Sequence, residues 1–207
     1  FAAAGDGVME FGLRRAQGPD AGLYGTRAAM IGGCIGTSNV LAGQMFDVPV
    51  KGTHAHSWIM SFADEYTAFK TYAKLYPDAC CLLVDTYDTL KSGVPNAIKV
   101  FTEMRESGIE LHNYGIRLDS GDLAYLSKKA RKMLDEAGFE DAFISASNDL
   151  DEYLIHDLKI QGAAITSWGV GTNLITSKDC PSFGGVYKLA AIQKEDGKFH
   201  SKIKLSE

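Results

Sequence analysis

The chain has 207 residues, of which 45% are hydrophobic and 23% are charged, so it is long enough to bury one sizeable core. This is the composition of an ordinary globular protein, and it excludes a disordered or coiled-coil chain. The formal net charge of −5 argues against a nucleic-acid partner, which normally needs a basic surface. No apolar run approaches the ~20 residues that span a bilayer, so we expect no membrane partner.

In chain order, strand-like apolar runs alternate with segments whose apolar residues recur every three or four positions. We predict a strand at 48–50, a helix at 57–76, a strand at 80–84, a helix at 95–107, a strand at 114–118, a helix at 122–137, a strand at 142–146, a helix at 150–158 and a strand at 164–168. This order is typical of parallel βαβ units.

About five such units are too few to close an eight-stranded barrel. The sequence therefore predicts an α/β fold over residues 1–183, an irregular partial (β/α) barrel of parallel strands, with a doubly wound sheet as the alternative. After Gly184-Gly185, segments 186–192 and 198–204 flank Glu195-Asp196-Gly197 and predict a hairpin. We expect residues 184–207 to begin a second, β-rich domain.

The cysteines and the start of the sequence bear on the cellular compartment of the protein, and the two chain ends bear on whether the sequence is part of a longer one. Cys34, Cys80, Cys81 and Cys180 lack the spacing of a zinc site, and we interpret them as small apolar residues of a reducing compartment. With no basic-then-apolar start, we expect a cytoplasmic protein. The chain begins at Phe1 rather than at Met and ends within a predicted hairpin, so we expect it to be part of a longer polypeptide.

Two histidines follow the first predicted strand, in Gly52-Thr53-His54-Ala55-His56-Ser57. If that strand continues, His54 and His56 share a face, which suits a metal pair, but no third ligand has a supporting spacing and we assign no metal ligands. Alternatively, His56 lies at the N-terminus of the next helix, where the helix dipole favours a neutral imidazole that can accept a phosphoryl group. A simple capping histidine explains this run equally well.

Three other polar runs are candidates for a site, and two of them, at 117–122 and 169–173, follow predicted strands. By strand periodicity Arg117 and Asp119 face the same side, where Arg suits an anion and Asp suits ribose hydroxyls, Mg²⁺ or a ring nitrogen. The alternative is an internal ion pair, with Asp122 capping the next helix. The Gly-rich run at 169–173 suits a phosphate or a plain turn equally well. Phe11 beside Arg14 and Arg15 can stack a flat ring and hold anions, although an exposed charged turn is the simpler account.

Seven runs together resemble nicotinate phosphoribosyltransferases, and they occur in the order of that family. They are EFGLRRAQGPD (10–20), SNVLAG (38–43), GTHAHS (52–57), LLVDTYDT (82–89), RLDSGDL (117–123), GVGT (169–172) and GGVYKL (184–189). The resemblance implies a type II phosphoribosyltransferase of NAD salvage, which forms nicotinate mononucleotide and pyrophosphate from nicotinate and phosphoribosyl pyrophosphate. It also implies Mg²⁺, ATP hydrolysis through a phosphohistidine, and a homodimer of the full-length chain.

The resemblance assigns a role to each matching residue. It implies that His56 is the phosphorylated histidine, Thr53 contacts nicotinate, Phe11 stacks on the pyridine ring, Arg14 binds anions beside it, Arg117 takes the nicotinate carboxylate, Asp119 faces the ring or ribose, and Gly171 with Thr172 holds the sugar phosphate. Ser38 favours nicotinate, because the nicotinamide-using relatives carry an Asp there, which would repel a carboxylate.

Three alternative functions stay open at this point. One is a nicotinamide- or quinolinate-type phosphoribosyltransferase. Another is a barrel aldolase or isomerase, for which Lys51 is the nearest Schiff-base candidate. The third is an inactive fragment that only binds nucleotides.

Overall fold

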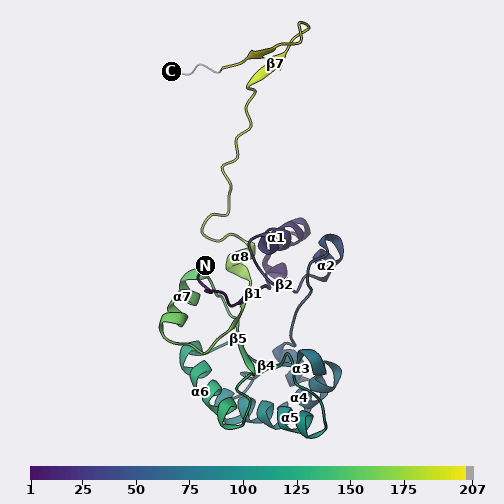
Figure 1. Ribbon diagram of the computed structural model, residues 1–207, viewed down its shortest axis with the longest axis vertical. Helices are drawn as coiled ribbons and strands as arrows, with labels where there is room; N and C mark the ends of the chain where they lie inside the picture. Colours follow the sequence, from purple (N-terminus) through teal and green to yellow (C-terminus); the bar gives the residue numbers. More distant parts are fainter. Residues whose placement is uncertain (204–207) are drawn as a thin grey trace.

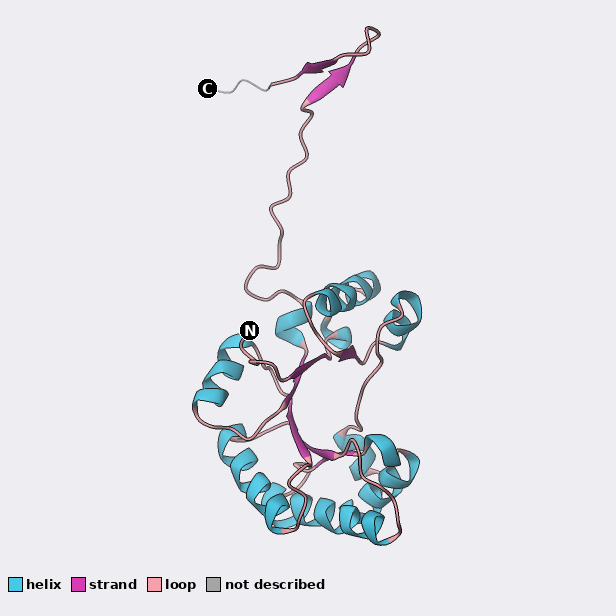
Figure 2. Cartoon of the chain, viewed as in Figure 1, coloured by secondary structure: helices cyan, strands magenta, loops and turns pink. Residues whose placement is uncertain are grey.

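The structure, a computed structural model, describes residues 1–203. Its main feature is one curled sheet of six parallel strands in the order β2-β1-β6-β5-β4-β3. Helices lie along the outer face of this sheet, and the inner face surrounds the middle of the molecule (Figure 2). The strands are β1 (Gly7–Glu10), β2 (Gly36–Thr37), β3 (Cys81–Leu83), β4 (Gly115–Leu118), β5 (Phe143–Ala146) and β6 (Ser167–Val170).

The predicted partial (β/α) barrel is therefore confirmed. A doubly wound sheet would carry helices on both faces, and the helices here lie on one face only (Figure 1). They are α1 (Pro19–Ile31), α2 (Val40–Phe46), α3 (His56–Met60), α4 (Glu65–Leu75), α5 (Val94–Glu106), α6 (Leu123–Glu136), α7 (Glu152–Ile160) and α8 (Thr172–Ile175). Short 3-10 helices occur at Leu13–Arg15 (η1) and Pro77–Ala79 (η2), and a π-helix at Thr89–Gly93 (η3).

The core lies between the sheet and the helices that cover it. Its largest fully buried side chains include Trp168, Phe69, Phe101 and Phe139. Full burial of such a side chain stabilises a fold by about 1.5–3 kcal/mol. Most of the buried side chains belong to strands β3 to β6 and to the helices α4 to α7 that cover them, so this part of the fold supports the loops at the edge of the sheet.

Four of the five strands predicted in the barrel segment and all four predicted helices are present, with two differences. The helix predicted at 57–76 is two helices, α3 and α4, because Asp64 accepts a hydrogen bond from the N–H of Thr67 at 2.8 Å and starts a new helix there. The last strand begins at Ser167, three residues later than predicted.

Most of the helices and strands that the pattern missed (β1, α1, β2 and α2) lie at the start of the chain, whereas the short α8 lies further along it. β1 contains a buried charge, β2 has only two residues, and α1 contains two glycines, so none shows a strong apolar period. Parallel pairing of β1 with both β2 and β6 nevertheless places it inside the sheet.

Residues 49–56, which we call the closing segment, run through the gap between the two edge strands β2 and β3 (Figure 2). Thr37 donates its N–H to the carbonyl of Pro49 at 3.0 Å, and Lys51 donates to the carbonyl of Thr37 at 2.8 Å. The result is one parallel bridge between Thr37 and Val50. The strand predicted at 48–50 is therefore wrong, because β2 offers only two residues for pairing and Pro49 has no N–H to donate.

The C-terminal segment forms the predicted hairpin in a shorter version. β7 (Ala191–Gln193) and β8 (Phe199–Ser201) pair antiparallel, and Gly197 in the turn has a φ of +73°. The hairpin stands away from the barrel at the end of an extended segment (Figure 1). Lys204, the predicted end of the second strand, lies outside the described residues, and the domain division at 183/184 stays a prediction.

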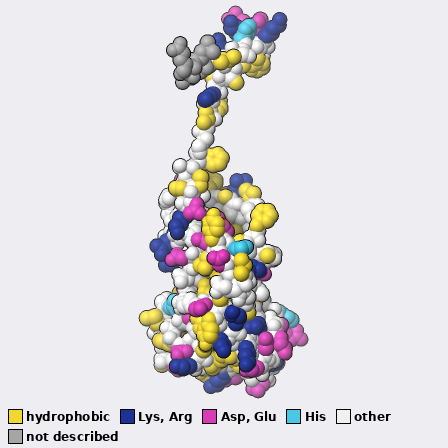
Figure 3. All heavy atoms as spheres, turned by 90° about the vertical axis from the view of Figure 1, so that its left-hand side faces the viewer, with side chains coloured by type: hydrophobic (Ala, Val, Ile, Leu, Met, Phe, Trp, Pro, Cys, Tyr) yellow, Lys and Arg dark blue, Asp and Glu magenta, His cyan; other side chains and the backbone are white. Residues whose placement is uncertain are grey.

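The outer surface carries charges of both signs. On the face seen in Figure 3, acidic and basic side chains lie next to one another over the barrel, without an extended basic surface. Within residues 1–203, none of the helices has both the length and the apolar character needed to cross a bilayer.

Gly93 provides a test of the packing between η3 and the sheet. Its φ of −59° is helical, so alanine would ordinarily be favourable there, but a Cβ would overlap the carbonyl oxygen of Val84. We expect Gly93→Ala to lower the free energy of unfolding by about 3 kcal/mol in chemical denaturation. The control is Gly184→Ala, whose Cβ meets nothing within 4 Å. Equal stability of the two variants would contradict this packing.

Candidate active site

A cavity of about 690 Å³ opens where the carboxyl ends of the strands meet, which is the usual place for an active site in a barrel. It brings together all nine site residues that the sequence predicted, namely Phe11, Arg14, Ser38, Thr53, His56, Arg117, Asp119, Gly171 and Thr172. Arg15, which the sequence grouped with Arg14, also lines it, as do Ser147, Asn148 and Asp149, to which the sequence gave no role.

The carboxylate of Glu10 fixes the loop that carries Phe11 and Arg14. Glu10 is completely buried at the end of β1, and it accepts hydrogen bonds from the N–H of Gly12 and from the hydroxyls of Thr26, at 2.8 Å, and Thr37, at 2.6 Å. Because a buried charge without partners is costly, these donors hold the loop after β1, helix α1 and strand β2 together. Sequence reasoning missed Glu10 because carboxylates are rarely buried.

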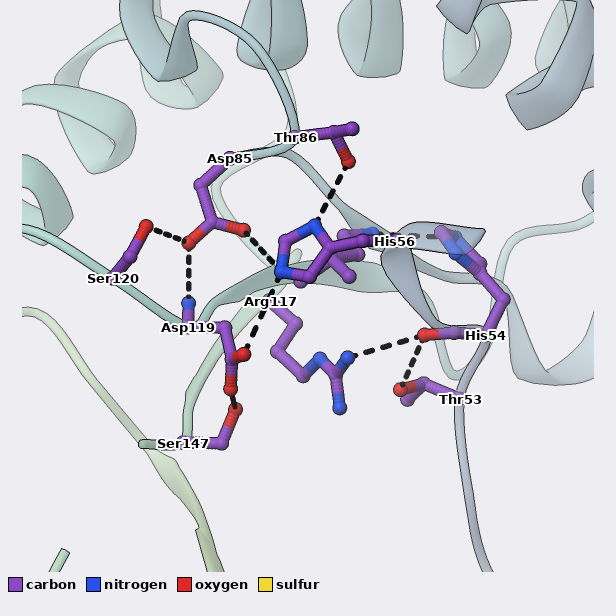
Figure 4. A network of polar contacts seen from close by, with 10 residues as sticks. Thr53, His54, His56, Asp85, Thr86, Arg117, Asp119, Ser120 and Ser147 are labelled. Atoms are coloured by element: carbon purple, nitrogen blue, oxygen red, sulfur yellow. Dashed lines mark hydrogen bonds and ion pairs between the residues drawn. The ribbon is translucent and has the colours of Figure 1, made fainter. Parts of the chain in front are cut away.

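His56 is the first residue of α3, and its ring lies between a hydroxyl and two carboxylates (Figure 4). Nδ1 is 3.0 Å from Oγ1 of Thr86. Nε2 is 3.5 Å from Oδ2 of Asp119 and 3.9 Å from Oδ1 of Asp85. The His56 side chain is 37% exposed, so the ring is held in place and is also accessible from the cavity.

Asp85 is a site residue that sequence reasoning missed. Its side chain is only 2% exposed, and Oδ2 accepts hydrogen bonds from the N–H of Asp119 at 2.8 Å and the hydroxyl of Ser120 at 2.6 Å. Oδ1 has no hydrogen-bond partner within the described part of the chain and faces His56 (Figure 4). A signal was present, because Asp85 directly follows a predicted strand in the same way as Asp119 does.

Arg117 is a cation that forms no salt bridge with a carboxylate within residues 1–203. Its Nη2 donates to the carbonyl of His54 at 3.1 Å, and its Nε has no hydrogen-bond partner in residues 1–203. The internal ion pair with Asp119, considered as an alternative, is therefore wrong, and Asp119 instead accepts a hydrogen bond from the hydroxyl of Ser147. Asp122 caps α6 as predicted, by accepting from the N–H of Tyr125 at 2.9 Å.

The glycines of the run 169–172 allow close packing against the loop after β1. A Cβ on Gly169 would lie 2.7 Å from the ring of Phe11, and a Cβ on Gly171 would lie 3.1 Å from the carbonyl oxygen of Phe11. The glycines are thus explained by the contact that holds the Phe11 ring at the cavity. The phosphate-binding role of Gly171 and Thr172 stays a prediction.

His54 lies on the opposite side of the closing segment from His56. Its ring is buried edge-on against Tyr72, with centroids 4.6 Å apart, and its Nε2 accepts a hydrogen bond from the N–H of Leu83 at 3.3 Å. The two histidines therefore do not form a metal pair, and residues 1–203 contain no group of three or more His, Cys, Asp or Glu placed to hold a metal. Lys51 lines a separate cavity inside the curled sheet, so a Schiff-base site has no support.

A profile of the Nicotinate phosphoribosyltransferase (NAPRTase) family matches residues 7–198. The chain belongs to the nicotinate phosphoribosyltransferase family. The nicotinate phosphoribosyltransferase of Bacillus subtilis (strain 168) is 61% identical over 203 residues, which cover 98% of this chain and 40% of the relative. The nicotinate phosphoribosyltransferase of Dictyostelium discoideum is 40% identical over 245 residues, which cover 97% of this chain and 40% of the relative.

Two solved structures have a similar fold. The crystal structure of human nicotinic acid phosphoribosyltransferase matches with a TM-score of 0.72 and 32% identity, over 82% of this chain and 44% of that chain. The crystal structure of a nicotinate-nucleotide pyrophosphorylase from Pyrococcus furiosus matches with a TM-score of 0.70 and 27% identity, over 85% of this chain and 44% of that chain. The chain thus spans about 40% of the length of the curated relatives.

The buried imidazole of His54 makes the stability of this family member depend on pH. Burial lowers the pKa of His54 from 6.5 to about 4, with the nearby Arg117 and His56 acting in the same direction and a backbone hydrogen bond at Ala55 opposing them. Because the unfolded chain binds the proton first, this residue makes the free energy of unfolding fall as the pH drops from 6.5 towards 4, by about 3 kcal/mol.

The pH dependence is measured by chemical denaturation at several pH values, in comparison with His54→Gln. The variant has no titrating group at this position, so the difference in stability between the two proteins should shrink as the pH is lowered through this window. A difference that is constant with pH would show that His54 is not held neutral in the fold.

Proposed function

We propose that the full-length protein is a cytoplasmic nicotinate phosphoribosyltransferase, which makes nicotinate mononucleotide and pyrophosphate from nicotinate and phosphoribosyl pyrophosphate in NAD salvage. The observation that carries the proposal is the composition of the cavity. Arg14, Arg15 and Arg117 line it without forming a salt bridge in residues 1–203, beside the ring of Phe11 and the imidazole of His56. A flat anionic substrate and a polyphosphate together match this set of groups.

Nicotinate binding follows from three side chains of the cavity. The ring of Phe11, which is half-buried against Gly169, offers a face on which pyridine can stack. Arg117 has donors left over after its bond to His54, and these suit a carboxylate. The hydroxyl of Ser38 can donate to the same carboxylate, whereas Thr53 is the candidate for a further ring contact.

In the transfer step the ring nitrogen of nicotinate attacks C1 of the ribose as the bond between C1 and pyrophosphate breaks. Positive charge develops on the ribose and negative charge on the leaving group. Asp119, with Asp149 on the neighbouring loop, lies where a carboxylate can stabilise the ribose cation. Arg14 and Arg15 are the candidates for holding pyrophosphate, and Gly171 with Thr172 for holding the 5′-phosphate.

The donor set fits a Mg²⁺ ion that arrives with the substrate. Proteins commonly hold Mg²⁺ through one or two carboxylates while phosphate oxygens and water complete the shell. Asp119 is 33% exposed at the cavity, and Asp85 has a buried oxygen without a hydrogen-bond donor among the described residues. When bound, the ion would neutralise charge on the leaving pyrophosphate.

ATP coupling is proposed to act through His56. In the tautomer in which Nδ1 donates to Thr86, Nε2 is unprotonated and can attack the γ-phosphorus of ATP. The N–P bond forms as the bond to ADP breaks, and no proton needs to move. A phosphate on His56 would add charge and acceptors beside Asp119, where it can order Mg²⁺ and pyrophosphate.

We also expect the full-length chain to work as a homodimer.

The activity is tested by following product formation with full-length protein, Mg²⁺, ATP and phosphoribosyl pyrophosphate. We expect nicotinate to be converted to nicotinate mononucleotide with release of pyrophosphate. Faster turnover of nicotinamide, or turnover of quinolinate, would instead assign the corresponding type of phosphoribosyltransferase. Binding of nicotinate mononucleotide in calorimetry without any turnover would show a nucleotide-binding protein.

The phosphohistidine is tested with γ-labelled ATP. We expect acid-labile label on the full-length protein and none on His56→Ala, because no other histidine lines the cavity. His112→Ala is the matched control, since that side chain is 68% exposed and lies outside this cavity. Label that persists in His56→Ala would contradict the assignment.

Ser38 tests the choice between nicotinate and nicotinamide. In Ser38→Asp a carboxylate faces the carboxylate of nicotinate, so we expect kcat/KM for nicotinate to fall by about 30-fold or more. Ser38→Ala, which removes only a neutral hydroxyl, should cost about fivefold. If Ser38→Asp uses nicotinate as well as Ser38→Ala does, Ser38 does not face the carboxylate.

A further inference from the structure

His54 has no task in the proposed chemistry, yet it sits where the sheet would otherwise be open. β3 is an edge strand of the curled sheet, and the N–H of Leu83 points away from β4 into the gap. An edge N–H in a buried position needs an acceptor. Nε2 of His54 provides it, at 3.3 Å.

The closing segment is thus bound to both edges of the sheet by different means. On the side of β2 it is held by two backbone hydrogen bonds around Thr37. On the side of β3 it is held by the side chain of His54. The ring cannot swing away, because it packs edge-on against Tyr72, with centroids 4.6 Å apart, and lies 6.1 Å from the ring of Phe69.

The backbone of His54 extends this connection into the cavity. Its carbonyl oxygen accepts the hydrogen bond from Nη2 of Arg117 at 3.1 Å and lies 3.4 Å from the hydroxyl of Thr53 (Figure 4). Arg117 has no other hydrogen-bond acceptor among residues 1–203. The position of its guanidinium therefore depends on where the His54 carbonyl is held.

We propose that His54 is a positioning residue, which joins the closing segment to the edge of β3 and thereby sets Arg117 for the carboxylate of nicotinate. This inference rests on the proposed function. It requires the tautomer with a proton on Nδ1, because Nε2 accepts from Leu83. The burial that lowers the pKa of His54 to about 4 keeps the ring neutral at physiological pH and preserves that acceptor.

Three substitutions at His54 distinguish the effect of its hydrogen-bond acceptor from the effect of the shape of its ring. His54→Phe keeps a ring against Tyr72 and removes the acceptor. His54→Gln places an amide oxygen close to the position of Nε2, whereas His54→Asn has the same amide on a shorter chain that reaches only the position of Nδ1. Tyr72→Phe, which keeps the ring packing and removes a hydroxyl, is the control for packing.

The experiment measures kcat and the KM for each substrate with the full-length enzyme. We expect His54→Phe and His54→Asn to raise the KM for nicotinate about tenfold while the KM for phosphoribosyl pyrophosphate stays within about twofold. His54→Gln and Tyr72→Phe should stay within about threefold of the unmodified enzyme for both substrates. A residue needed only for folding would change both KM values together, or neither.

Coupling to Arg117 is tested by a double-mutant cycle. In an Arg117→Lys background, His54→Phe should raise the KM for nicotinate by less than about twofold, because the guanidinium that it positions is gone. Hydrogen exchange provides a second readout that does not need activity. The amide of Leu83 should be protected in the unmodified protein and in His54→Gln, and should exchange faster in His54→Asn.

The outcomes distinguish this inference from the proposed function. Absence of nicotinate turnover in the unmodified enzyme would defeat the proposed function, and Leu83 exchange would then still test the contact. With turnover present, an unchanged KM for nicotinate in both His54→Phe and His54→Asn overturns the positioning role. If His54→Phe does not fold, the comparison of His54→Gln with His54→Asn decides, and equal KM values for nicotinate in these two variants overturn the role.

Discussion

Parallel pairing of the strands is the constraint on which the rest of the structure depends. Because all six strands of the curled sheet run in the same direction, their carboxyl ends share one edge. Residues far apart in the sequence, such as Phe11, Arg117 and Thr172, therefore line one cavity. The covered outer face buries the apolar side chains, so the loops at that edge are left to carry polar groups.

The edge loops are held by buried polar contacts rather than by further strand pairing. Glu10 gathers donors from the loop after β1, from α1 and from β2. Asp85 gathers donors from the loop after β4 and faces His56. Each carboxylate needs these donors to offset its desolvation, so each fixes the loop that provides them. The arginines of the cavity form no salt bridge within the described residues, which leaves their charge available to anionic ligands.

The sequence predicted the part of the fold in which the signals are local. The short apolar strands β3 to β6 alternate with helices of clear apolar period and were found. β1 and β2 were not found, because β1 ends in the buried carboxylate of Glu10 and β2 has only two residues. The place of β1 within the sheet depends on contacts with β6, about 160 residues away in the chain, which no local pattern can show.

The same limit applies to the site. Polar residues at strand ends predicted the rim, and every residue assigned from the family resemblance lines the cavity. Asp85 and Glu10 were missed because what defines them is burial and the donors around them, both of which come from other elements. His54 could not be separated from His56 by spacing, since only the three-dimensional path of the closing segment sends the two rings to opposite sides.

We propose that the cavity at the carboxyl ends of the strands binds both halves of nicotinate mononucleotide. A crystal structure of the full-length protein with nicotinate mononucleotide tests this most directly. We expect the pyridine ring against Phe11, its carboxylate within hydrogen-bond distance of Arg117, and the phosphate at Gly171 and Thr172. A nucleotide bound elsewhere, or bound here with its carboxylate away from Arg117, would contradict it.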